Sequence, residues 1–78
     1  MALRDDLASD AHQAWMDRMI ADGVTSCLSN LTGEEQLVPF AQLSVRVQQY
    51  DYDLVDVILA SLTKRGYQLL HRDKEKPW

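Results

Sequence analysis

The clearest pattern in the sequence is an amphipathic spiral at the amino end. Apolar residues recur on one side of a 3.6-residue period, and polar residues fall on the opposite side. The apolar set is Leu3, Leu7, Ala8, Ala11, Ala14, Trp15 and Met19, and the polar set is Asp6, Asp10, Gln13 and Asp17. Because a glycine past the last periodic residue can close a helix in the left-handed conformation, we expect the helix to end at Asp22-Gly23.

The segment that follows has a weaker period. Serine, asparagine, threonine and glycine over residues 29–33 predict a loop, and the apolar stretches on either side of it could each form a short strand. Pro39 fixes its own φ and keeps Val38 out of the helical region. A second, short helix is therefore expected to begin near Pro39 and to run toward Tyr50.

A strongly periodic apolar run then predicts a third helix. Its members are Leu54, Val55, Ile58, Leu59 and Leu62. Asp53 precedes the run and can accept hydrogen bonds from the free amides of a first helical turn. Lys64 and Arg65 complement the carboxyl-terminal dipole and Gly66 supplies a stop, so signals at both ends agree.

These elements predict a mainly α fold, a small bundle of about three helices with a central loop and minor short strands. Residues 1–70 form one domain, because a chain this short buries only about 60% of its unfolded surface and supports a single core. Residues 67–70 are expected to pack on that core as an extended segment. Residues 71–78 alternate charges without an apolar face and are expected to form a charged tail.

Charge and composition narrow the setting of the protein. Twelve acidic against eight basic side chains give a formal net charge of −4, which disfavours contact with a nucleic-acid backbone. The single cysteine, Cys27, cannot form an intramolecular disulfide. The amino end lacks the apolar core of a signal peptide, and the longest apolar run is too short for a bilayer. We expect a cytoplasmic protein without a membrane partner.

No residue set indicates catalysis, a metal or a cofactor. His12 and His71 lack the paired spacing of a zinc site. The carboxylates of Asp51, Asp53 and Asp56 lack the glycine and the terminal glutamate of a calcium loop. The three glycines stand apart, so there is no phosphate-binding loop. We therefore expect a protein that is not an enzyme and that has no catalytic residues.

Several short motifs occur in an order that resembles a known family. The first helix carries Leu7-Ala8, His12 and Trp15 and is followed by Gly23; then come Pro39-Phe40 with Leu43, and finally Leu62, Gly66 and Tyr67. This order is similar to that of the RyR domain, the repeat first described in ryanodine receptors and also found in bacterial and phage proteins. The resemblance runs over residues 7–70 and implies a non-catalytic recognition module built from a few helices.

The sequence departs from that family in the loop. Val24 stands where the family has an aromatic residue after the first glycine, and the acidic stretch 32–36 replaces a basic Lys-Thr-His-Pro stretch. A ligand that the family's loop would contact is therefore not implied for this chain.

The candidate recognition surface is the place where the first helix meets the Pro39-Phe40 turn, because aromatic faces beside a polar edge supply both stacking area and orientation. Arg18, one turn beyond Trp15, could pair with an anionic ligand. Trp15 and Phe40 are equally suited to anchoring the core. The candidate ligand or partner residues are His12, Trp15, Arg18, Pro39, Phe40 and Tyr67.

Three functions remain open from the sequence. The first is a recognition module, as in a phage or bacterial accessory regulator, for a small anionic, nucleotide-like ligand or a protein partner. The second is a winged-helix transcription regulator with residues 40–49 and 54–65 as its helix pair. The third is a homo-oligomeric, homodimeric for example, protein-interaction domain, in which Met16 and Ile20 lie off the main apolar stripe and form a second sticky face.

Overall fold

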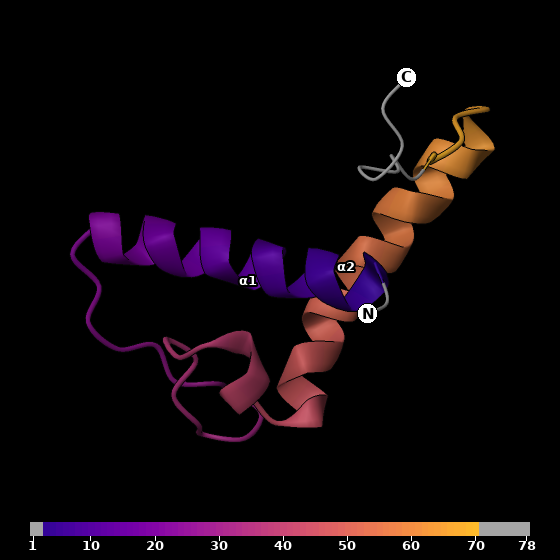
Figure 1. Ribbon diagram of the computed structural model, residues 1–78. Helices are drawn as coiled ribbons and strands as arrows, with labels where there is room; N and C mark the ends of the chain where they lie inside the picture. Colours follow the sequence, from indigo (N-terminus) through magenta and orange to yellow (C-terminus); the bar gives the residue numbers. More distant parts are fainter. Residues whose placement is uncertain (1–2, 71–78) are drawn as a thin grey trace, which may run out of the picture.

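Two long helices and the loop between them make up the fold. The computed structural model describes residues 3–70, which contain α1 (Leu3–Ala21), the 3₁₀ turn η1 (Phe40–Gln42) and α2 (Val45–Lys64). The amino-terminal half of α1 crosses the middle of α2, and the carboxyl-terminal part of α2 extends beyond the crossing (Figure 1). The mainly α prediction is confirmed. Residues 3–70 contain two α-helices instead of about three, and in place of strands a single isolated bridge between Leu28 and Glu35.

Both helices end at a glycine in the left-handed conformation, as predicted. At the end of α1, Gly23 has φ of +83°, its amide donates to Ile20 O at 3.0 Å, and the Val24 amide donates to Met19 O at 3.0 Å. The same pair of bonds closes α2 around Gly66. These bonds satisfy carbonyls that have no partner within the helix, and only glycine adopts this φ without steric cost.

The start of α2 differs from the prediction. The second helix near Pro39 is only the three-residue η1, and the third helix does not begin at Asp53. Instead α2 begins after Ser44, whose Oγ accepts a hydrogen bond from the Val47 amide at 3.3 Å. No glycine or proline interrupts residues 45–65, so one helix continues through both predicted segments. The helix pair required by a winged helix is therefore not formed.

Two glutamates organise the loop that leads to α2. Glu34 accepts hydrogen bonds from the Ser44 hydroxyl at 2.6 Å and from the Ser44 amide at 3.0 Å. Glu35 accepts from the Ser26 hydroxyl at 2.6 Å and from the Cys27 amide at 2.7 Å. These bonds lower the pKa of both carboxyls, with the serine hydroxyls as the largest cause. The acidic stretch of the loop thus holds the loop together.

The core is small and lies where α1, the loop and α2 meet. Its buried apolar residues are Ala8, Met16, Leu43, Val47 and Val55. Ala8, His12 and Met16 follow each other at four-residue intervals, so they form the innermost line of α1. Met16 therefore belongs to the core and not to the second sticky face that the homo-oligomer alternative assigned to it, whereas Ile20 is 60% exposed.

Residues 67–70 do not pack on the core, in contrast to the prediction. Tyr67 is 67% exposed and Leu70 is 84% exposed. They follow the end of α2 that extends beyond α1, where no other helix offers a surface to pack against (Figure 1). The predicted charged tail, residues 71–78, lies outside the described residues.

Candidate functional site

A row of four aromatic rings joins α1, η1 and α2. The ring of His12 lies 5.4 Å from that of Trp15 and 6.0 Å from that of Phe40, measured between centroids. Phe40 in turn meets Tyr52 edge-on at 5.6 Å. The structure thus brings together three of the residues singled out in the sequence. Trp15 and Phe40 are each partly buried, so each packs against its neighbours in the row and also keeps some surface exposed to solvent.

His12 is the most buried polar residue in this row. It is 5% exposed, and its Nε2 lies 2.8 Å from the carbonyl oxygen of Val38. Because a carbonyl oxygen can only accept a hydrogen bond, Nε2 carries a proton and donates it. In the neutral ring the other nitrogen, Nδ1, is then an acceptor.

Asp51 on α2 faces this second nitrogen. Its Oδ2 lies 3.7 Å from His12 Nδ1, which is too long for a hydrogen bond. The Asp51 side chain is 23% exposed. Burial raises the pKa of Asp51, and this effect outweighs the opposing attraction of His12. When the His12 ring is neutral, Nδ1 and the Asp51 carboxylate face each other as two acceptors.

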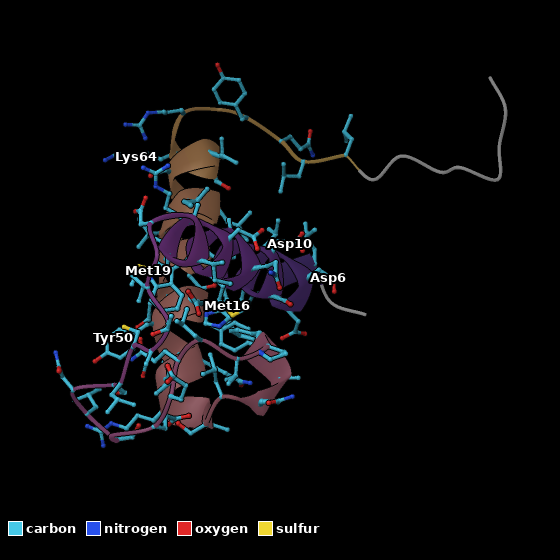
Figure 2. All side chains as sticks on the ribbon, turned by 90° about the vertical axis from the view of Figure 1, so that its left-hand side faces the viewer. Asp6, Asp10, Met16, Met19, Tyr50 and Lys64 are labelled. Carbon is cyan, nitrogen blue, oxygen red and sulfur yellow. The ribbon has the colours of Figure 1, made fainter. Side chains whose placement is uncertain are left out.

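The two acceptors open into a hollow of about 220 Å³ between α1, the loop and α2. We call it the Asp51 hollow. Its lining consists of His12, Trp15, Gln36, Val47, Tyr50 and Asp51. Tyr50 is 61% exposed and projects outward from the half of α2 that lies beside the loop (Figure 2). The hollow therefore combines a buried imidazole and a carboxylate with two aromatic walls.

A larger and more open depression of about 390 Å³ lies on the other side of Tyr50. Its lining is Leu31, Val45, Arg46, Gln49, Tyr50 and Asp53. Gln49 donates to Asp53 at 2.8 Å, so these two polar groups already satisfy each other. Unlike the Asp51 hollow, this depression has no buried side chain in its lining.

The remaining predicted residues lie elsewhere. Pro39 is exposed and caps the amino end of η1 beside the row. The Arg18 side chain is 77% exposed and pairs with Asp22 at 3.3 Å, within the last turn of α1. Tyr67 follows the end of α2, beyond the crossing. Arg18 and Tyr67 therefore do not line the Asp51 hollow.

Sequence reasoning missed the residues that α2 contributes to the hollow. Val47, Asp51 and Val55 are spaced by four and share one face of a continuous helix. A carboxylate between two apolar residues on a buried face was the available signal. It is hidden because the sequence places the start of a helix at Asp53, which leaves Asp51 outside that helix.

A second acid–base pair fixes the crossing of α1 and α2 at the other end of the aromatic row. Arg4 donates two hydrogen bonds to Asp56, at 2.7 and 2.9 Å, and its guanidinium lies 4.3 Å above the centre of the Tyr52 ring. Tyr52 donates its hydroxyl to Asp5 at 2.8 Å. The bond from Arg4 lowers the pKa of Asp56. We call this cluster the Arg4 clamp.

Neither metal-binding clusters nor membrane spans occur in the part of the chain that the structure describes. No three histidine, cysteine, aspartate or glutamate side chains gather there in a way that could hold an ion. Neither α1 nor α2 has an apolar stretch long enough to cross a bilayer. Comparisons with protein-family models, with curated proteins and with solved structures each gave no match to this sequence.

Proposed function

We propose that this chain is a non-catalytic recognition module that binds a cationic side chain of a protein partner in the Asp51 hollow. The observation that carries the proposal is the 3.7 Å separation between His12 Nδ1 and the Asp51 carboxylate, which are both acceptors when the ring is neutral. An ammonium or guanidinium group has only donors to offer, so it can hydrogen bond to both acceptors at once.

The surroundings of this pair favour a cation for two further reasons. An ionised carboxylate that is partly removed from water gains more from a cation than an exposed one does, because the local dielectric constant is lower. The walls of the hollow include Trp15 and Tyr50, and aromatic faces attract cations. The net charge of −4 adds a long-range attraction toward basic partners.

The sequence left two ligand classes open, a small anion and a protein partner, and the geometry favours the protein partner. An anion in the Asp51 hollow would be repelled by the carboxylate. Arg18, the expected contact for an anion, lies outside the hollow and pairs with Asp22. The resemblance to the RyR domain fits a recognition module, since two of its motif residues, His12 and Trp15, line the hollow.

A binding assay with peptides of matched length tests the proposal. Fluorescence anisotropy would compare a labelled Arg/Ser peptide with a Glu/Ser peptide in about 0.15 M salt, where exposed charges more than about 8 Å apart are screened. We expect the basic peptide to bind and the acidic peptide not to bind. Adenosine monophosphate, added while the melting temperature is monitored, represents the anionic ligand, and we expect no shift.

Two isosteric variants separate the hollow from the general charge of the protein. Asp51→Asn removes the carboxylate from the hollow, and we expect it to abolish binding of the basic peptide. Asp10→Asn removes the same charge from an exposed position of α1 and should leave binding unchanged. Equal affinities for the two variants, or a melting shift with the nucleotide alone, would overturn the proposal.

A further inference from the structure

The carboxyl-terminal part of α2 presents an apolar face that nothing in residues 3–70 covers. Leu54 is 54% exposed, Val57 is 63% exposed and Ile58 is 52% exposed. Residues spaced by three and four lie on the same side of a helix, so these side chains form one continuous patch, the α2 stripe. The α2 stripe begins level with the crossing, where Arg4 of α1 binds Asp56, and the helix then continues beyond α1 to Lys64 (Figure 2).

Two opposite charges lie along one flank of the α2 stripe. Asp53 stands before its first residue and Lys64 stands at the last position of the helix. Eleven residues separate them, which is about three helical turns, so both side chains leave the helix on nearly the same side. This flank is acidic at its start and basic at its end. When two such flanks meet in opposite directions, the acidic end of each therefore faces the basic end of the other.

We propose that a second copy of this chain docks on the α2 stripe, with the two α2 helices antiparallel. In an antiparallel pair related by a two-fold axis, positions on the same flank face each other. An axis beside Ile58 sets Asp53 of each copy against Lys64 of the other, so the contact contains two opposite-charge pairs. A parallel pair would instead place this flank of each copy on opposite sides of the contact, so Asp53 and Lys64 would not pair across it.

The composition of the stripe fits this occupant. Aliphatic side chains at three- and four-residue spacing are the residues that pack between two helices. The three residues of the α2 stripe are apolar, and the oppositely charged residues lie on its flank. Apolar contact would therefore supply the affinity, and the charges would select the direction of the pair. This surface is separate from the Asp51 hollow, and none of its three apolar residues lines that hollow.

Sedimentation equilibrium on the full chain, from about 5 µM to about 500 µM, tests whether a dimer forms. Ile58→Glu places a charge in the middle of the stripe, and we expect it to abolish the dimer while the circular dichroism spectrum is unchanged. Ile20→Glu is the matched control, because Ile20 is 60% exposed, against 52% for Ile58, but lies on α1. It should leave the dimer intact.

Charge reversal tests the antiparallel direction. Asp53→Lys and Lys64→Glu should each weaken the dimer at least about tenfold, since each converts two attractive pairs into two repulsive pairs. The double variant Asp53→Lys/Lys64→Glu restores opposite charges and should recover the affinity. A monomer at every concentration, a dimer that survives Ile58→Glu, or a double variant without recovery would overturn the proposal. Peptide binding at the Asp51 hollow should not change in Ile58→Glu.

Discussion

Two carboxylates of α2, Asp51 and Asp56, each face a basic side chain of α1, and the two pairs differ in nearly every physical respect. Asp56 is exposed and accepts two hydrogen bonds from Arg4, at 2.7 and 2.9 Å. Asp51 is partly buried and stays 3.7 Å from the His12 ring. The pKa of Asp56 is lowered and that of Asp51 is raised. The first pair holds two helices together, whereas the second keeps its hydrogen-bonding capacity for another molecule.

The different partners explain the contrast. Arg4 has a long side chain whose forked guanidinium can match both carboxylate oxygens from the surface. His12 is held by its bond to Val38 O and by ring contacts with Trp15 and Phe40, so it cannot turn toward Asp51 without losing them. A carboxylate beside a rigid, already committed group remains available to a ligand.

Removing His12 should have the largest effect on stability. His12→Ala deletes a buried ring and leaves the Val38 carbonyl without its donor, and we expect it to lower the free energy of unfolding by about 3 kcal/mol. Gln13→Ala, at the exposed neighbouring position, should change it by less than about 0.5 kcal/mol. Urea denaturation measures both values. A loss below about 1 kcal/mol for His12→Ala would show that the aromatic row does not depend on this ring.

Removing the guanidinium of the Arg4 clamp should have a smaller effect that depends on salt. Arg4→Ala deletes an exposed ion pair and a contact with the Tyr52 ring, and we expect a loss of stability smaller than that of His12→Ala. The loss should shrink toward 1 M salt, where the screening length is about 3 Å. Thermal unfolding at low and high salt measures it, with Arg46→Ala as the control. A loss that does not depend on salt would indicate packing and not charge.

The sequence predicted those parts of the fold that short-range rules decide. Gly23 and Gly66 end their helices because a glycine can adopt positive φ wherever a helix needs to close. The charges and apolar residues of the last turns of α2 were placed correctly for the same reason. These features depend on neighbours within one or two turns, and such neighbours are visible in the sequence.

The candidate site depends on contacts that the sequence does not reveal. The partner of His12 is the carbonyl of Val38, 26 residues further along the chain. Ser44 rather than Asp53 caps α2, and the bond between Ser44 and Glu34 spans 10 residues. Serine and aspartate are equally good caps by local rules. The sequence around each residue therefore does not show whether the helix begins at Ser44 or at Asp53. Once α2 is continuous, Asp51 turns toward α1 and the hollow is formed.

The contrast between Asp51 and Asp56 is tested most directly by replacing each with asparagine and measuring how the free energy of unfolding depends on pH. The pKa of Asp56 in the folded chain is lowered from 3.8, so its carboxylate stabilises the fold above that value, and the contribution is lost as the pH falls through the folded pKa. The pKa of Asp51 is raised from 3.8, so the fold favours its protonated form, and this advantage is lost as the pH rises through the folded pKa.

Urea unfolding between pH 7 and about pH 3 would compare Asp51→Asn and Asp56→Asn, with Asp10→Asn as the reference for a lost surface charge. We predict that at pH 7 Asp51→Asn raises the free energy of unfolding above the Asp10→Asn value and that Asp56→Asn lowers it. The Asp51→Asn difference should vanish at the acidic end, and the Asp56→Asn difference should shrink as the pH falls below 3.8. A loss of stability in Asp51→Asn at pH 7 would contradict the proposal, because it would make the His12–Asp51 pair a structural bond like that of Arg4 and Asp56.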